Sequence, residues 1–167
     1  METTVDIERD LARIAEQERR LCFPRFDAES AWELGARLKV LAEKRKAALC
    51  IEIRLLGQTS FFFAMPGTTP INADWARRKR NAVELMQKSS YAIGLGLQRD
   101  GSDLESKLGL PTRDYASHGG GFPIRADGVG CIGVVTVSGL PQREDHGLVV
   151  EALAAMLDLP LEELALD

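Results

Sequence analysis

The two histidines of this chain lie in segments whose residue types could bind a small ligand. His118 is followed by Gly119, Gly120 and Gly121, which places an imidazole that titrates near neutral pH beside backbone amides that no side chain covers. Such a segment can form a site for a small anion or a planar ligand. The alternative is a tight connection in which the glycines satisfy the backbone geometry and His118 is solvated.

His146 directly follows Asp145, in a segment that passes from an expected strand into an expected helix. Neighbouring residues on a helix point about 100° apart, so these two side chains cannot share one face. We therefore expect Asp145 to cap or support the start of the helix and His146 to point outward or towards a neighbour.

A third candidate is the start of a helix in which Trp75 is followed by Arg78 and Lys79. Residues three and four positions apart are neighbours on a helix, so an indole would lie beside positive charge and could meet a carboxylate-bearing ligand. The alternative is a tryptophan in the core with a solvated basic face.

Three familiar motifs are incomplete in this sequence. The run from Gly128 to Gly133 matches G-x-G-x-x-G, but β-branched residues follow it instead of a helix, which argues against a dinucleotide site. The segment that begins at His118 resembles the oxyanion-hole segment of lipases, but the chain lacks the G-x-S-x-G turn that a serine hydrolase needs. Two histidines without paired cysteines make a closed structural metal site unexpected.

Length, composition and cysteine content lead us to expect a single cytoplasmic domain. The chain has 167 residues, of which 45% are hydrophobic, and we expect one domain over residues 1–167. Its net charge of -4 indicates neither a nucleic-acid partner nor an anionic membrane. Cys22, Cys50 and Cys131 form no C-x-x-C pair and are expected to be buried free thiols, and we find neither a signal peptide nor a membrane span.

The first half of the chain predicts two helices, a hairpin and a third helix. Apolar spacing predicts helices over 4–20 and from a cap at Asp27 to about Lys46. Alternation over 49–55 predicts a half-buried strand, and the apolar run 61–65 predicts a partner strand that is covered on both faces. Asn72 is expected to cap the third helix, which Ser89-Ser90 interrupts.

The second half predicts a short helix, a polar loop, a second hairpin and a last helix. The helix is expected over 91–98, and the glycine-rich stretch 100–121 is the expected functional loop region. Residues 122–125 and 129–137 predict a hairpin around Asp127-Gly128, with a central second strand. Pro141 suits the first position of a helix that Pro160 ends. Two antiparallel hairpins in one sheet argue against a parallel nucleotide-binding fold.

Several segments together resemble the haem-degrading or haem-binding-protein-like family, in its intracellular and largely uncharacterised branch. The resemblance spans nearly the whole chain and is carried by 65–69, by Asn72, Trp75, Lys79 and Val83, by Ser89-Ser90, by 118–124, and by 137–142 with Asp145-His146. It implies a profilin-like α/β sandwich, with an antiparallel sheet and flanking helices, assembled into symmetric homo-oligomers. It also implies binding or breakdown of haem.

These observations leave three functions open. The first is binding of a small molecule, with haem as the cofactor that the resemblance implies. His118 or His146 would then supply an axial nitrogen, Trp75 and Phe122 would stack on the ring, and Lys79 or Arg78 would meet a propionate. The second is a non-catalytic oligomeric adaptor. The third is an enzyme with His118 as general base and Asp145 or Lys79 nearby.

Overall fold

The computed structural model describes residues 5–167, which form six α-helices, five strands and one short 3-10 helix. In chain order these are α1 (Ile7–Arg20), β1 (Cys22–Phe23), α2 (Ala28–Lys44), β2 (Cys50–Leu55), β3 (Gln58–Ala64), α3 (Pro70–Met86), α4 (Ser90–Arg99), α5 (Leu104–Leu108), β4 (Gly121–Ala126), β5 (Gly130–Ser138), α6 (Gln142–Met156) and η1 (Leu161–Glu163). Within these residues no helix is both long and apolar enough to cross a membrane.

The strands form one sheet in the order β1-β4-β5-β2-β3. The β2-β3 and β4-β5 pairs are the two expected antiparallel hairpins, and they join through an antiparallel pairing of β2 with β5. The strand β5 is therefore central, as its length and apolar character predicted. Only β1, a parallel partner of β4 at one edge, was not predicted, because two residues are too short to carry a pattern.

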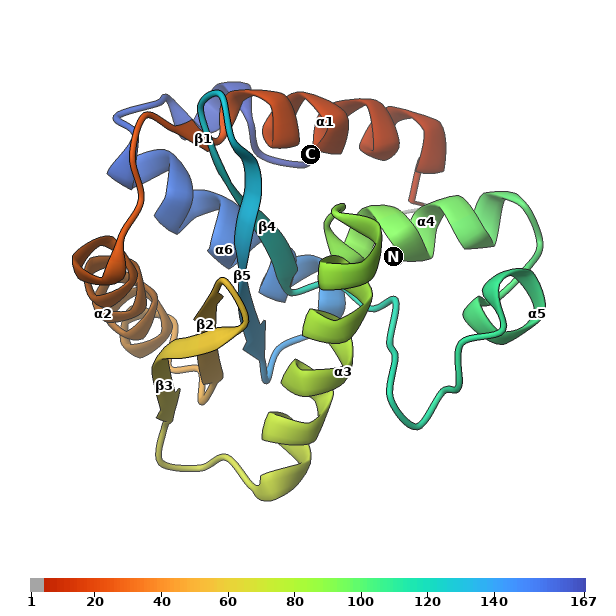
Figure 1. Cartoon of the computed structure of the whole chain (residues 1–167), viewed down its shortest axis with the longest axis horizontal. Helices are drawn as coiled ribbons and strands as arrows, with labels where there is room; N and C mark the ends of the chain where they lie inside the picture. Colours follow the sequence, from red (N-terminus) through yellow and green to blue (C-terminus); the bar gives the residue numbers. More distant parts are fainter. Residues whose placement is uncertain (1–4) are drawn as a thin grey trace.

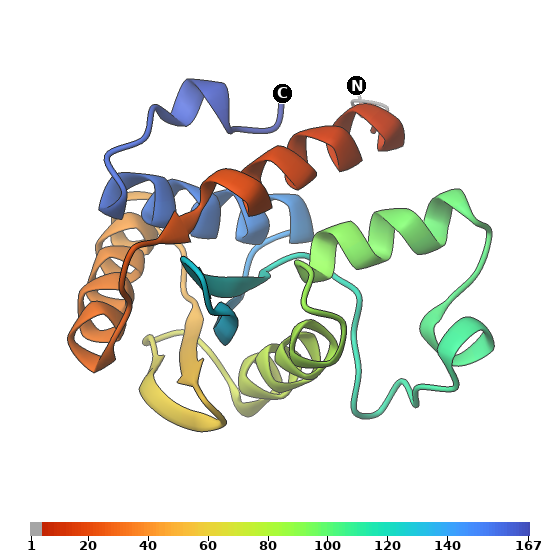
Figure 2. The same cartoon turned by 45° about the horizontal axis from the view of Figure 1, so that its top comes forward.

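Helices cover both faces of this sheet, which gives the predicted α/β sandwich (Figure 1). The helices α2 and α6 pack on one face, where the main core contains Leu34, Leu38, Ile51, Val135 and Leu153. The helix α3 packs on the opposite face, against β2, β4 and β5. Figure 2 shows α1 and the C-terminal segment outside α6, on the side away from α3.

The prediction that the second strand is covered on both faces is wrong. The strand β3 lies at the edge of the sheet, pairs only with β2, and leaves the side chain of Phe62 half exposed. Apolar character alone does not distinguish an edge strand from a central one, because it does not say which helices reach the strand. The adjacent prediction of a half-buried β2 also needs correction, since Glu52 is buried in an ion pair with Arg80.

Helix boundaries differ from the predictions by one to three residues. Thr69, and not Asn72, precedes the first residue of α3, and the side-chain oxygen of Asn72 accepts a hydrogen bond from the Thr69 amide at 3.0 Å. Pro141 stands just before α6 instead of at its first position. That helix ends at Met156, and Pro160 precedes η1. Asp6 caps α1, and position 4 of the predicted first helix lies outside the described residues.

The polar stretch that begins at Asp100 is an ordered connection that α3 holds in place. It contains the short helix α5, and several hydrogen bonds tie its remainder to α3. Arg78 Nε donates to the Thr112 carbonyl at 2.9 Å, Asn81 Nδ2 donates to the Asp114 carbonyl at 2.9 Å, and the Ala116 amide donates to the Arg78 carbonyl at 3.1 Å. This connection brings His118 to the side of α3.

Candidate functional site

Lys79 of α3 joins three segments that are far apart in the sequence. Its side chain is buried, and its Nζ donates to the Gly119 carbonyl at 3.0 Å and to the Val137 carbonyl at 2.6 Å. It also forms a buried ion pair with Asp145, at 3.2 Å. Burial lowers the pKa of Lys79 and raises the pKa of Asp145, and the attraction between the two charges opposes both shifts.

Asp145 supports the start of α6, as the sequence predicted. Its carboxylate accepts hydrogen bonds from the backbone amides of Gly139 at 3.3 Å and of Leu140 at 3.0 Å. These amides precede the helix, so Asp145 fixes the chain where β5 passes into α6. Together with Lys79, it positions the end of β5 against α3.

The three glycines allow the chain to pass through this crowded place. Gly120 has a φ of +131°, and a Cβ built on it would contact the Val137 carbonyl, Lys79 Nζ and the Asp145 side chain. The Gly119 amide donates to Gln142 Oε1 at 3.2 Å, and the Gly121 amide donates to Ser90 Oγ at 2.9 Å. Side chains of the protein therefore accept the hydrogen bonds of these two amides. This favours the tight connection over a glycine loop whose amides are open to a ligand.

A pocket of about 300 Å³ lies beside this connection, and we call it the His118 pocket. It brings together three of the predicted segments and is lined by Asn72, Trp75, Lys79, His118, Gly119, Ser138, Gly139, Leu140, Gln142 and Asp145. His118 is exposed at its rim, and its ring packs edge-to-face on Trp75 with 5.1 Å between centroids. The Arg78 guanidinium lies over the Trp75 ring, 4.2 Å from its centroid.

The His118 imidazole is suited to donate a lone pair at neutral pH. Partial burial lowers its pKa below the usual 6.5, and the nearby charges of Lys79 and Arg78 lower it further. Within residues 5–167 neither ring nitrogen has a hydrogen-bond partner. A neutral imidazole with an accessible nitrogen can bind a metal centre or accept a proton.

Ser138, Asn72 and Gln142 line the pocket but were not predicted as binding residues. Ser138 is the last residue of β5, is only 5% exposed, and its hydroxyl makes no hydrogen bond within the part of the chain that the structure describes. The sequence could have indicated Ser138 only through its position at the end of a predicted strand. The contacts of Lys79 show that α3 and the glycine segment meet β5 at this end.

Two predicted ligand-binding residues lie in the core and do not line the pocket. Phe122 is 1% exposed and packs in the main core on the α6 side of the sheet. His146 is also 1% exposed, so of the two expected directions, outward or towards a neighbour, the outward one is wrong. Its Nε2 lies 2.7 Å from Gln17 Oε1 of α1, because α1 covers the face of α6 that carries His146. Burial lowers the pKa of His146 to about 3, and Arg143 adds to this shift.

The remaining candidates have structural contacts. Arg78 stacks on Trp75 and reaches Thr112 but does not line the pocket. Gly120 and Gly121 are buried beside Lys79 and Val83. Of the cysteines, Cys50 is buried, whereas Cys22 and Cys131 are partly exposed, and all three are free thiols. The part of the chain from residue 5 onward holds no group of three His, Cys, Asp or Glu side chains that could bind a metal ion.

The sandwich and the order of its elements define a known class of α/β fold. The solved structure of the Ybr137w protein is similar over 89% of this chain and 87% of that chain, with a TM-score of 0.81 and 26% sequence identity. The structure titled as the PduOC:heme complex covers 78% of this chain and 94% of that chain, with a TM-score of 0.66 and 20% identity, and shares the fold.

The chain belongs to the family described as haem degrading protein HbpS-like, whose pattern matches residues 26–154. Among its relatives is a UPF0303 protein of Azotobacter vinelandii, which is 61% identical over 163 residues that cover 98% of both chains. A UPF0303 protein of Rhizobium meliloti is 53% identical over 98% of this chain and 99% of its own. The family resemblance stated from the sequence is confirmed.

Proposed function

We propose that this protein binds a small molecule in the His118 pocket, with haem as the first ligand to test. The observation that carries the proposal is the exposed, neutral imidazole of His118 held against Trp75 at the rim of the pocket. Its surroundings are rigid, because the Lys79–Asp145 pair ties the three segments that form the pocket. A preorganised set of groups of this kind favours binding, because little conformational entropy is lost.

The residues present fit haem in part. His118 offers the accessible nitrogen that an axial ligand needs, and Trp75 offers an aromatic face beside it. The Arg78 guanidinium, 4.2 Å from the Trp75 ring centroid, could meet a propionate, whereas Lys79 already donates to three acceptors. A volume of about 300 Å³ lies at the lower end of the range for ligand pockets, so only part of the macrocycle would enter it.

A haem titration of the purified protein, followed by visible absorbance, tests this proposal. We expect a saturable Soret shift that His118→Ala removes and that His118→Met retains with a different spectrum, because a thioether also ligates haem iron. His146→Gln is the matched control, and it should bind as the wild type does, since His146 lies in the core. An absent shift, or one that His118→Ala leaves unchanged, would reject haem ligation by His118.

A second candidate function, assembly with other protein chains, is favoured by an exposed apolar surface on α2. Trp32 is 67% exposed and Val40 is 46% exposed, next to a cavity of about 580 Å³ that α2 and α6 line. Exposed apolar groups of this size often mark interaction sites. Sedimentation of the wild type and of Trp32→Asp tests it: an oligomer that the substitution dissociates supports assembly through this surface.

An enzyme that uses His118 as general base has less support from the geometry. Asp145 already accepts hydrogen bonds from Lys79, Gly139 and Leu140. Lys79 donates to Gly119, Val137 and Asp145, so both groups are engaged in holding the backbone. A second catalytic group would have to come from Ser138 or from outside this chain.

A further inference from the structure

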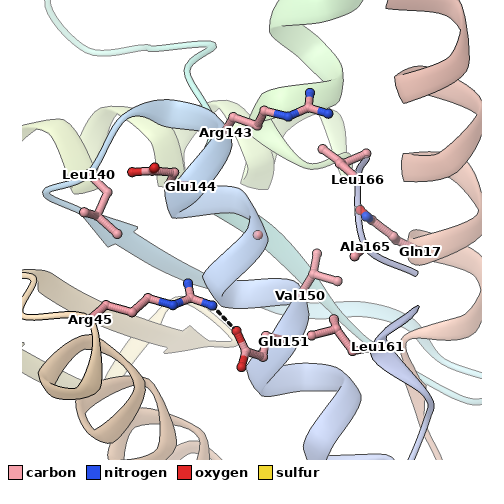
Figure 3. Close-up of a pocket in the computed structure, with 11 residues that line it drawn as sticks. Gln17, Arg45, Leu140, Arg143, Glu144, Val150, Glu151, Leu161, Ala165 and Leu166 are labelled. Carbon is pink, nitrogen blue, oxygen red and sulfur yellow. Dashed lines mark hydrogen bonds and ion pairs between the residues drawn. The ribbon is translucent and has the colours of Figure 1, made fainter. Parts of the chain in front are cut away.

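A further cavity, distinct from the one beside Trp32 and also of about 580 Å³, lies between α6, the end of α2 and the C-terminal segment, and we call it the α6 cavity (Figure 3). Its lining is Gln17, Arg45, Leu140, Arg143, Glu144, Gly147, Val150, Glu151, Leu161, Ala165 and Leu166. Figure 3 shows Arg45 and Glu144 on one side of α6, and Leu161 and Leu166 on the other. Apart from Leu140, which lines both, this cavity shares no residue with the His118 pocket.

Gly147 lies in the interior of α6 and leaves the cavity open. A glycine inside a helix destabilises it by about 1 kcal/mol relative to alanine, so its presence needs a reason. No packing neighbour supplies one, because a Cβ built on Gly147 would meet no atom within 4 Å among residues 5–167 beyond its chain neighbours and the adjacent backbone of α6. A glycine in such a place allows an external molecule to approach the helix backbone.

Charged groups of both signs that retain unoccupied hydrogen-bonding atoms within the described residues face the cavity. Arg45 donates to Glu151 through one terminal nitrogen, Nη2, and its Nε and Nη1 have no partner within the described chain. Glu144 is exposed, and its carboxylate accepts no hydrogen bond there. Arg143 is different, because it is already engaged with Asp10, with Tyr91 and with the Asp167 carbonyl.

A ligand with a single charge would meet an unfavourable partner in this cavity. An anion that reached Arg45 would lie near the carboxylates of Glu144 and Glu151, and a cation that reached Glu144 would lie near Arg45. A zwitterion satisfies both signs. Apart from Gln17, the remaining lining is apolar, through Leu140, Val150, Leu161, Ala165 and Leu166, which suits an aliphatic or aromatic body.

We propose that the α6 cavity binds a small zwitterion with an apolar side group, with its carboxylate at Arg45, its ammonium at Glu144 and its body over Gly147. Free apolar amino acids and short apolar peptides share this chemistry. The site is separate from the His118 pocket and does not depend on the function proposed for that pocket.

Isothermal titration calorimetry with L-leucine and with leucyl-leucine tests the proposal and distinguishes the two sources. We expect saturable binding of at least one of them. 4-Methylpentanoate, which lacks the ammonium, and 3-methylbutylamine, which lacks the carboxylate, should each bind at least about tenfold more weakly, because one of the two charged groups of the cavity loses its partner.

Substitutions in and outside the α6 cavity test whether the ligand binds there. Gly147→Leu fills the open space and should abolish binding, whereas Gly96→Leu makes the same change on α4, where a Cβ also meets nothing, and should bind normally. Glu144→Gln changes an exposed side chain, keeps the fold and should weaken binding at least about tenfold. His118→Ala should leave it unchanged.

Three results would overturn the proposal: no heat with either zwitterion, equal affinity for the singly charged analogues, or unchanged binding by Gly147→Leu and Glu144→Gln.

Discussion

Lys79 connects α3, the glycine segment after His118 and the end of β5 through a single buried ammonium group. The sequence presents it as one of four consecutive basic residues, 77–80, and this pattern alone suggests a solvated helix face. Its neighbours differ, because Arg77 and Arg78 bind the polar connection and Arg80 pairs with Glu52. The role of each basic residue follows from what lies opposite it, and spacing within the helix does not contain that information.

Replacing Lys79 tests the importance of the buried pair. Lys79→Met leaves the Asp145 carboxylate buried without its counter-charge, and we expect it to lower the free energy of unfolding by about 3–5 kcal/mol. Urea denaturation measures the change. Lys107→Met, the same substitution at an exposed pair with Asp100, should have no measurable effect. Similar unfolding midpoints for the two variants would contradict the structural role of Lys79.

The crowding around Gly120 leads to a second prediction at the residue scale. Gly120→Ala places a methyl group against Val137, Lys79 and Asp145 at a positive φ, and should destabilise the protein by more than about 1 kcal/mol. Gly96→Ala, in the open interior of α4, should instead stabilise it by about 0.5–1 kcal/mol. Thermal unfolding of both variants gives the comparison, and a stable Gly120→Ala protein would show that the segment can relax.

At the scale of elements, α1 is attached to α6 and to the C-terminal segment by one buried chain of polar groups. Gln17 Oε1 contacts His146 Nε2 at 2.7 Å, and Gln17 Nε2 donates to the Leu164 carbonyl at 2.7 Å. Arg143 adds an ion pair with the buried Asp10 of α1. The prediction of an amphipathic α1 was correct, but its buried polar face could not be assigned, because polar residues usually mark the solvent side.

Burial of His146 makes the stability of this region depend on pH. Its pKa is about 3 in the folded protein, below the usual 6.5, through burial and Arg143, with Asp10 acting in the opposite direction. Between about pH 6.5 and pH 3, the imidazole of residue 146 is therefore protonated in the unfolded chain but neutral in the folded protein. Stability is complete above about pH 6.5 and falls as the pH decreases, by up to about 1.4 kcal/mol per pH unit.

His146→Gln should remove this part of the slope while it retains a polar partner for Gln17. We would compare urea unfolding of the variant and the wild type at pH 7.5 and pH 5.5, with His118 present in both. A larger loss of stability at low pH in the wild type is expected, and parallel losses in the two proteins would show that His146 is protonated without penalty.

The elements themselves were largely predictable, whereas their exact ends and edges were not. Both hairpins, the interruption of the helices at Ser89-Ser90 and the central position of β5 follow from apolar period and turn residues. The edge position of β3 and the pairing of β1 with β4 depend on contacts between distant segments. The prediction that Asn72 precedes α3 was also wrong, because its side chain lies inside the first turn and accepts a hydrogen bond from the Thr69 amide.

At the scale of the whole molecule, the sandwich decides which candidate residues meet. Trp75, His118 and Asp145 come from three segments, and they converge on the His118 pocket because α3, the long connection and α6 meet at the end of β5. Phe122 and His146 belong to the same segments but point into the core on the opposite side. Residue types identified the segments, and only the fold shows which side of each segment faces the pocket.

The most direct test of the central claim uses Trp75 as a reporter beside His118. The chain has two tryptophans, so Trp32→Phe leaves a protein whose indole fluorescence comes from Trp75 alone. Haem added to this protein should quench the fluorescence and shift the Soret band with the same midpoint, and His118→Ala should remove both changes. Quenching and a Soret shift that persist in His118→Ala, or that follow different midpoints, would contradict binding in the His118 pocket.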